Sequence, residues 1–463
     1  MRKEKGKMKN IVKVWSSSVA FLLSAFSFLI LITSCSNDLD EALQPINNGA
    51  LQFVVSDFPA FGESGLTRAI GTQDEGKTAW ADGDQIIVTL TSQKYGGQAA
   101  ALTYNGSSWS TEASLSYLEN ETPSVSVFYA PCYEVTEEGT MQLRNGMQPG
   151  MTEYLSGNYE MGDGIMTITF EGAIRDYSRL RIAAMPEATL TVTTTDFTPA
   201  GATSEATEAY TLTADDKGNA YLYGIFAEGA MVSVKQGEVV LRDYTFTAEK
   251  NPNGTEHNKS YALDARPVID GTLGSKAEAT DAEVEALVQQ LKDYVDNGIT
   301  TITVTGSEPA MIEVDGLTLT AIGEAIYRLS EDDSYHGKID LILPDVTEIV
   351  DIEFHSADAL NSITLPKVTK LGKMAFFGAQ YLRIITFGSV LTEVNETGGV
   401  MFAWVGDEVG GCDLILNCGQ MNSEYIPDLE TNIWTFRYEN EFKSITLTHT
   451  GENSECDECK ANQ

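Results

Sequence analysis

The amino-acid sequence predicts a mainly β protein, in which an antiparallel β-sandwich of Greek-key type is followed by a short β-solenoid with one capping helix. Three observations lead to this prediction. Residues 50–266 contain many short segments in which apolar residues alternate with others, separated by turn formers, as in half-buried antiparallel strands. One amphipathic helical pattern begins at residue 280. Beyond it, apolar positions recur every 22 residues, which is typical of a stacked repeat.

The first 34 residues have the pattern of a signal peptide. Residues 1–18 hold six cations and one acid, and residues 19–32 form an apolar run of 14 residues. A membrane-spanning helix needs about 20 such residues, so the shorter run with its basic flank indicates a cleaved leader. We therefore expect residues 1–34 to be absent from the folded protein.

The end of this leader, Ile32-Thr33-Ser34-Cys35, resembles the bacterial lipobox. The resemblance implies lipid on the Cys35 thiol, cleavage before Cys35 and acylation of the new amino group. Several acyl chains anchor firmly, because each buried methylene contributes about 0.8 kcal/mol. Residues 35–49 are predicted to form an acidic tether, and Ser36-Asn37-Asp38-Leu39-Asp40-Glu41 within it is similar to the export signal of surface-exposed outer-membrane lipoproteins. The alternatives are a secretory peptide with a chance cysteine and a merely solvated tether.

The composition limits the classes of partner. The formal net charge is −37, and the chain after residue 34 stands at −42 because the leader holds six cations and one acid. So acidic a surface repels phosphate backbones, which excludes nucleic acid as a partner. Hydrophobic residues make up 42%, enough for a folded core, and a mature chain of about 430 residues predicts two or three domains.

Besides Cys35 the chain has an odd number of cysteines for an exported protein: Cys132, Cys412, Cys418, Cys456 and Cys459. If residues 412–418 form one straight strand, Cys412 and Cys418 lie about 20 Å apart, too far for a disulfide. We therefore expect the core, rather than disulfides, to hold the fold. Cys456 and Cys459 could complete a zinc site with that pair, but a polar tail over residues 451–463 is the preferred interpretation.

Residues 50–266 are predicted to form the sandwich, with a division into two subdomains near residue 185. The alternating apolar positions are Ile86, Val88 and Leu90; Val125, Val127 and Tyr129; Met166, Ile168 and Phe170; Leu190 and Val192; Tyr210 and Leu212; Val232 and Val234; and Tyr244 and Phe246. Turn formers such as Asn105-Gly106 and Lys217-Gly218 separate them.

Residues 267–279 are small and polar and are predicted to form a linker. Thr280-Asp281-Ala282-Glu283 then has the pattern of a capping box, in which Glu283 reaches back to the first residue. Gly298 marks the end of the apolar stripe that follows. We expect this to be the one helix of the mature chain.

Residues 280–450 combine the helix with the repeat. Three sets of positions recur at a spacing of 22: Leu343, Leu365 and Phe387; Leu341, Ile363 and Ile385; and Phe354 with Phe376. Repeats of this length with one strand each are typical of leucine-rich repeats, so we predict a leucine-rich-repeat solenoid. Segments 301–305, 414–416 and 444–448 are expected to be strands that cap the stack.

Several segments of residues 50–266 resemble fimbrillin-like surface lipoproteins. The segment Trp80-Ala81-Asp82-Gly83-Asp84-Gln85-Ile86 is similar to their W-x-x-G-D-x-I motif, and a hairpin from Tyr104 to Trp109 follows. Residues 170–174 with 180–182, and residues 259–263, are similar to their later strands. The 22-residue units resemble BspA-like leucine-rich repeats, which are linked to binding host surfaces.

The fimbrillin resemblance implies a mode of assembly. In polymerising members an arginine-specific protease removes the first strand, and a neighbour's strand fills the groove by β-augmentation. Arg68 and Ala69 lie between an early strand (residues 51–55) and Trp80, where such a cleavage would fall, although Arg68 could be an ordinary loop arginine. Polymerising members donate a C-terminal strand, whereas this chain continues to residue 463 after Leu263. A tip, accessory or free-standing role therefore fits better than a shaft subunit.

No catalytic, cofactor or metal site is predicted. The histidines lie outside any nucleophile or metal-ligand pattern: His257, His336, His355 and His449. The glycine pairs at 398–399 and 410–411 lack the Lys-Ser/Thr of a phosphate loop. Glu331, Asp332 and Asp333 could bind calcium, but a solvated acidic loop is the preferred interpretation.

The expected function is attachment or assembly by a surface-exposed, lipid-anchored outer-membrane protein without catalytic activity. Its expected partners are membrane lipid through acylated Cys35, and other fimbrial subunits or a host or bacterial surface protein or glycan. The alternative is carbohydrate capture for nutrient uptake, which a row of exposed aromatic side chains would favour. An enzyme is the third hypothesis, and it would need a pocket with paired carboxylates of separated pKa.

Overall fold

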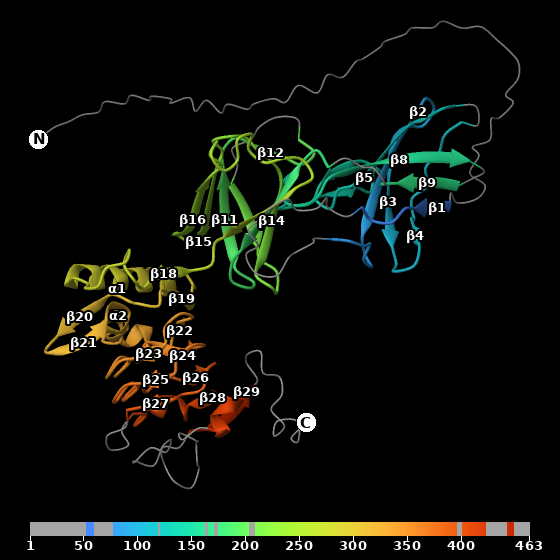
Figure 1. Ribbon diagram of the computed structural model, residues 1–463. Coiled ribbons are helices and arrows are strands. Elements are labelled where there is room, and N and C mark those ends of the chain that lie inside the picture. Colours follow the sequence, from blue (N-terminus) through green and yellow to red (C-terminus); the bar gives the residue numbers. More distant parts are fainter. Residues whose placement is uncertain are drawn as a thin grey trace, which may run out of the picture. The chain divides into compact units, whose positions relative to one another are not determined.

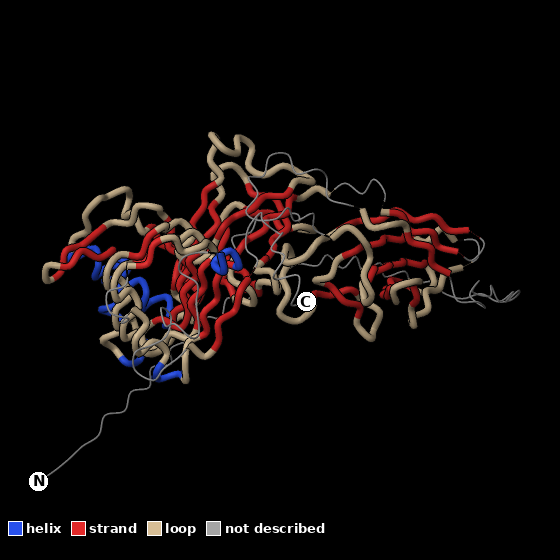
Figure 2. The backbone as a smooth tube through the Cα atoms, turned by 60° about the horizontal axis from the view of Figure 1, so that its bottom comes forward, coloured by secondary structure: helices blue, strands red, loops and turns tan. Residues whose placement is uncertain are grey.

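The computed structural model describes residues 52–59, 77–118, 121–162, 165–170, 175–202, 209–395, 401–422 and 442–448. All of them belong to one structural unit, Pro45–Gln463. The predicted leader (1–34), tether (35–49) and tail (451–463) lie outside the described residues. Within these ranges the protein is mainly β, as predicted, with its strands in several sheets and two α-helices (Figures 1 and 2).

The first sheet has seven strands in the order β1-β9-β8-β5-β2-β3-β4. The alternating apolar residues of its strands, Ile86, Val127 and Met166 among them, are buried together in one core. The predicted hairpin is present, with Tyr104 paired to Trp109. The strands are β1 (Gln52–Val55), β2 (Gln85–Ser92), β3 (Gly96–Tyr104), β4 (Trp109–Ser110), β5 (Ser124–Tyr129), β8 (Leu155–Gly162) and β9 (Ile165–Thr169), and a small hairpin joins β6 (Tyr133–Val135) to β7 (Met141–Leu143).

Two four-stranded sheets follow, in the orders β12-β14-β10-β17 and β13-β11-β15-β16. Both contribute side chains to a second core, for example Leu222 from one sheet and Val192 from the other. Their strands are β10 (Ser178–Ala183), β11 (Thr189–Thr194), β12 (Phe197–Pro199), β13 (Ala209–Thr213), β14 (Asn219–Phe226), β15 (Met231–Gln236), β16 (Val239–Thr245) and β17 (Ser260–Asp264).

The expectation of purely antiparallel sheets is wrong at two places. β1 pairs with β9 in parallel, and β10 pairs with β17 in parallel. In both cases the partners are far apart in the chain, and a long connection allows the second strand to return in the same direction. Alternation along a strand reveals which face is buried but not the direction of its neighbour, so the sequence pattern could not distinguish the two arrangements.

The third part of the chain forms a seven-stranded parallel sheet in the order β18-β19-β22-β24-β26-β28-β29. The predicted register is present, since Leu341 pairs with Ile363 and Ile363 with Ile385. The strands are β18 (Val268–Asp270), β19 (Thr301–Thr305), β22 (Ile339–Ile342), β24 (Leu360–Leu365), β26 (Ile384–Phe387), β28 (Asp413–Asn417) and β29 (Ser444–Thr448). Residues 268–270, expected to be linker, are thus a strand.

A second, narrower ladder accompanies the parallel sheet, and its paired residues lie 22 residues apart at the first step and 23 at the second. It consists of β23 (Glu348–Ile349), β25 (Lys370–Leu371) and β27 (Glu393–Val394). Aspartates also reach from one repeat to the next: Asp351 accepts a hydrogen bond from the Lys373 amide, and Asp358 accepts one from the Gln380 amide. These contacts join equivalent turns and hold the repeats in register.

Two α-helices precede the repeats, so the expectation of one helix is wrong. The first, α1 (Asp281–Asp296), has the predicted start, because the Glu283 carboxylate accepts hydrogen bonds from the amide and hydroxyl of Thr280. Gly298 after its end is left-handed (φ 74°). The second, α2 (Ala321–Leu329), follows a hairpin of β20 (Met311–Val314) and β21 (Leu317–Thr320), and short 3-10 turns occur at Asp333–Tyr335 (η1), Asp407–Val409 (η2) and Cys418–Asn422 (η3). No helix in the described ranges has the length and apolar character that crossing a membrane requires.

Candidate functional site

The first strand and the residues after it, 52–59, form a segment that enters the first core from the edge of its sheet. β1 is the terminal strand and is paired through β9. Its side chains alternate, because Phe53 and Val55 pack against the core while Val54 is 53% exposed. Phe58 at the end of the segment is 5% exposed. Residues 52–59 therefore contribute apolar side chains to a core that the other strands of this sheet otherwise build.

Specific contacts hold the backbone of this segment. The indole Nε1 of Trp80 donates to the carbonyl oxygen of Ser56 at 2.8 Å. The Ser56 amide donates to the Ile168 carbonyl at 2.9 Å, and its hydroxyl accepts from the Phe170 amide at 3.0 Å. The ring of Phe58 meets that of Trp80 edge-on, with centroids 4.8 Å apart. The tryptophan of the W-x-x-G-D motif thus holds the residues that directly follow the first strand.

A buried ion pair holds the far end of the segment. Arg175 is 1% exposed, and its Nε lies 2.9 Å from Oε2 of Glu153, which is 6% exposed. The Tyr177 hydroxyl donates to the same carboxylate at 3.1 Å, and burial together with that carboxylate raises the pKa of Tyr177. Arg175 Nη2 donates to the Pro59 carbonyl at 2.7 Å. One buried cation therefore links the first segment to the rest of the core.

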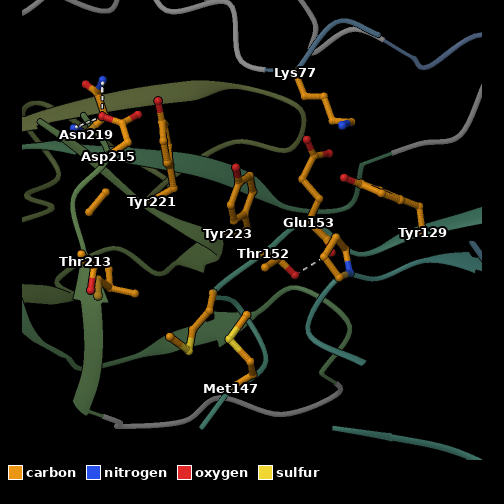
Figure 3. Close-up of a pocket in the computed structure, with 14 residues that line it drawn as sticks. Lys77, Tyr129, Met147, Thr152, Glu153, Thr213, Asp215, Asn219, Tyr221 and Tyr223 are labelled. Carbon is orange, nitrogen blue, oxygen red and sulfur yellow. Dashed lines mark hydrogen bonds between the residues drawn. The ribbon is translucent and has the colours of Figure 1, made fainter. Parts of the chain in front are cut away.

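A cavity of about 430 Å³ adjoins this network (Figure 3). Its wall includes Lys77, Tyr129 and Glu153 on one side and Asp215 and Tyr223 on the other. The two carboxylates have partners within the protein: Glu153 binds Arg175, and Asp215 accepts hydrogen bonds from amides of its own turn. Their contacts therefore stabilise the walls of the cavity.

A second feature is a column of aromatic side chains on successive turns of the repeats. His355 and Phe377 are stacked at 5.2 Å with 14° between their planes, and Trp404 meets Phe377 edge-on at 4.9 Å. His355 and Phe377 are half-buried, whereas Trp404 is 41% exposed. Because stacked rings cover one another's faces, most of this column presents ring edges to solvent. A flat platform for sugar rings, which carbohydrate capture would favour, is limited to the end of the column.

A buried carboxylate joins the α2 helix to the first repeat. Glu353 is 3% exposed and accepts hydrogen bonds from the amide and hydroxyl of Thr320, the N-cap of α2. Burial raises the pKa of Glu353 to about 7, although the two hydrogen bonds from Thr320 oppose the shift. Gly323 leaves space for this carboxylate, because a Cβ there would lie 2.4 Å from its Oε1.

This carboxylate predicts a pH-dependent stability. Glu353 keeps its proton in the folded state between its ordinary pKa of 4.5 and about 7, so its stabilising contribution is complete below pH 4.5 and is lost as the pH rises through 7. The free energy of unfolding should fall by about 3 kcal/mol across this range from this group. Urea unfolding at pH 5 and pH 8 measures it. Glu353→Gln should remove this fall, whereas Glu331→Gln on an exposed loop should retain it; equal profiles for all three proteins would contradict the assignment.

The residues predicted from sequence to be functional fall into two groups. Cys35, Arg68, Ala69, Cys456 and Cys459 lie outside the described residues, although the connection of residues 60–76 that contains Arg68 begins directly after Pro59. The three remaining cysteines have buried side chains: Cys132, Cys412 and Cys418. Burial raises the pKa of Cys412 to about 12, so this thiol is a core residue rather than a nucleophile.

The acidic loop at residues 331–333 has a local structural role. The Asp332 carboxylate accepts hydrogen bonds from the amide and hydroxyl of Ser334 and caps η1. Across the described part of the chain, no group of three or more metal-ligating side chains is close enough to hold an ion. The hydrogen bonds of Asp332 thus serve the local structure of this loop.

Sequence reasoning missed Arg175, Glu153 and Glu353. Each is a single charged residue whose role depends on neighbours from distant segments, and no local pattern distinguishes it from a surface charge. Trp404 did carry a signal. Phe402-Ala403-Trp404 matches Phe376-Phe377-Gly378 of the preceding repeat. An aromatic residue therefore occupies the position of a turn glycine.

The described part of the chain is thus a mainly β, multi-sheet protein. No protein-family description matches its sequence, and no curated protein matches it. Among solved structures, one similar chain is a Bacteroides fragilis protein that has been proposed to function in cell adhesion, with a TM-score of 0.26 and 11% identity. The alignment covers 46% of this chain and 92% of that one. A TM-score this low supports no conclusion about function.

Proposed function

We propose that this protein is a surface-exposed, lipid-anchored subunit without catalytic activity that mediates attachment or fimbria-type assembly at the outer membrane. In this proposal residues 50–266 are a fimbrillin-like β-sandwich region and residues 280–450 are a leucine-rich-repeat region. The leader and Cys35 support the anchoring, and the motifs around Trp80 support the fimbrillin likeness. The partners would be other fimbrial subunits or a surface protein or glycan of another cell.

The assembly part of the proposal rests on the edge position of residues 52–59, which we call the plug. Residues 52–59 lie at a sheet edge, pair with one strand only, and insert Phe53, Val55 and Phe58 into the core. Removing them would leave an apolar groove and unpaired backbone groups on β9, which is the condition for β-augmentation by another strand. Arg68 lies in the connection that a protease would have to cut to free the plug.

The test uses the chain without its leader and an arginine-specific protease. Cleavage after Arg68 should allow a fluorescent peptide with the sequence of residues 50–60 to replace the native segment, and the labelled complex should survive gel filtration. Arg68→Lys is the matched control, because it keeps the charge but removes the cleavage site. A peptide with Phe58→Asp should not bind, since a charge would enter the apolar groove. A cleaved chain that keeps its own strand and excludes the peptide would contradict assembly by strand exchange.

Anchoring and display are tested separately in cells. A fatty-acid probe should label the wild-type protein and not a Cys35→Ala variant, and protease added to intact cells should degrade the wild-type protein. An unlabelled wild-type protein would contradict the lipid anchor, and a protein that intact cells protect fully would contradict surface exposure.

A further inference from the structure

The last strand of the parallel sheet, β29, has an outer edge with which no strand of the described ranges pairs. β29 stands at the end of the strand order and pairs with β28 alone (Figure 1). Along a parallel strand, every second residue directs its amide and carbonyl groups toward one neighbour, and the residues between direct theirs to the other side. Part of the β29 backbone therefore faces away from the sheet, in the position to pair with a further strand.

The apolar layer of the repeats is also incomplete at this end. Leu414 and Leu416 of β28 are fully buried. Ile445 and Leu447 are their partners in β29, and both are only partly buried against the same core. Repeat arrays generally end in a unit with a polar outer face. β29 has an apolar inner side instead, so a further layer of side chains would increase the burial of its two apolar residues.

β29 lacks the features that normally keep edge strands apart. Natural edge strands are very short, or carry charged residues, proline or a β-bulge. The opposite edge of the same sheet is protected in this way, because β18 has three residues, contains Asp270 and directly follows Pro267. β29 has five residues, Ser444–Thr448, without charge, proline or a shift of register. Of the two edges of this sheet, β29 is therefore the one suited to pairing.

We propose that β29 pairs with β29 of a second copy of this chain, antiparallel about a two-fold axis. When the axis passes beside Thr446, Ile445 of one copy lies opposite Leu447 of the other. Ser444 then lies opposite Thr448, so apolar residues meet apolar ones and hydroxyl groups meet hydroxyl groups. The strand is thus complementary to itself, as a two-fold interface requires. The two parallel sheets would join, and each copy would close the apolar layer of the other.

The charge of the protein opposes this association and makes it depend on salt. The formal net charge is −37, so two copies repel each other. Salt screens that repulsion between exposed charges, whereas the proposed contact itself contains no charged residue. Dimerisation should therefore strengthen as the salt concentration rises. The contact goes beyond the proposed exchange of the plug, because it needs neither cleavage at Arg68 nor residues 52–59.

Sedimentation velocity of the uncleaved full chain without its leader measures the association, with a reductant present so that no disulfide joins two copies. The wild type should pass from monomer to dimer across the micromolar range. In about 1 M salt, where the screening length is about 3 Å, the dimer should form at a lower protein concentration.

Two variants of one residue test the position of the axis. Thr446→Lys and Thr446→Glu should each weaken dimerisation at least about tenfold, because like charges would meet at the two-fold axis. An equal mixture of the two variants should dimerise again, since opposite charges then meet, and a misfolded variant would not be rescued in this way. Thr386→Lys is the matched control, because Thr386 lies in the same row of the sheet, on the interior strand β26. It should dimerise as the wild type does.

Four results would overturn the proposal. A wild type that stays monomeric at both salt concentrations would show that the edge does not pair with a second copy. An equal loss in Thr386→Lys would assign the contact to the face of the sheet. A mixture of the Thr446 variants that stays monomeric would show that the two strands do not meet there. A chain that dimerises only after removal of residues 449–463 would show that its own tail occupies the edge. The strand-exchange assay uses cleaved protein and the plug, so either assay can fail without the other.

Discussion

Phe376→Ala should lower the free energy of unfolding of the repeat region by about 3–5 kcal/mol, the usual cost of removing a fully buried ring. Phe376 is fully buried and stacks between Phe354 and Phe402, with centroids 5.7 Å from each. Removing the Phe376 ring would open a cavity between Phe354 and Phe402. Neither neighbouring ring could fill that cavity without shifting the repeats out of register. Urea unfolding followed by circular dichroism measures the loss.

Phe377→Ala is the matched control for this prediction. Phe377 is the next residue, has the same volume, and is half-buried in the outer column. Its removal exposes less new surface, so we expect roughly half of the loss or less. Equal losses of stability at the two positions would show that the buried stack of Phe354, Phe376 and Phe402 does not hold the repeats together.

Arg175→Met should destabilise the first core by about 3–5 kcal/mol, because it leaves the Glu153 carboxylate buried without a cation. The effect should be concentrated on residues 52–59, since Arg175 also holds the Pro59 carbonyl. Hydrogen exchange of the β1 amides should therefore accelerate more than that of β10. In the strand-exchange assay, the labelled peptide should enter the cleaved variant faster than the cleaved wild type.

Two comparisons separate this network from a general loss of charge. Adding Glu153→Gln to Arg175→Met should recover part of the stability, because the buried charge is gone. Arg266→Met breaks a more exposed pair with Asp264 and should cost less than about 1 kcal/mol. A similar loss at Arg266 and Arg175, with no recovery in the double variant, would contradict a buried clamp.

Much of the fold could be predicted from local patterns. The alternation at Ile86, Val88 and Leu90 correctly predicted a strand with a buried face, and the spacing of Leu341, Ile363 and Ile385 predicted their pairing. Thr280 and Glu283 predicted the start of α1. These patterns are visible in the sequence because each one reflects regularly spaced buried positions or a hydrogen bond between residues close in the chain.

The second helix shows where such signals fail. α2 has only nine residues, contains Gly323, and follows directly on a strand. Glycine weakens the helical pattern. The need for glycine at position 323 comes from a distant residue, because a Cβ there would meet the Glu353 carboxylate. The candidate site was only partly predictable for the same reason: the Trp80 motif was visible, but its acceptor on Ser56 was not.

Local patterns were sufficient to predict the strand-rich character, the 22-residue period, the exposed and buried faces and the first helix, because period and local capping are properties of neighbouring residues. Tertiary structure alone decided that β1 runs parallel to β9, that Arg175 and Glu353 are buried, and that Trp404 stands at the end of a stack. These features depend on which distant segments meet. Whether a charge is buried and in which direction a strand runs depend on the free energy of the whole core, and no single segment determines them.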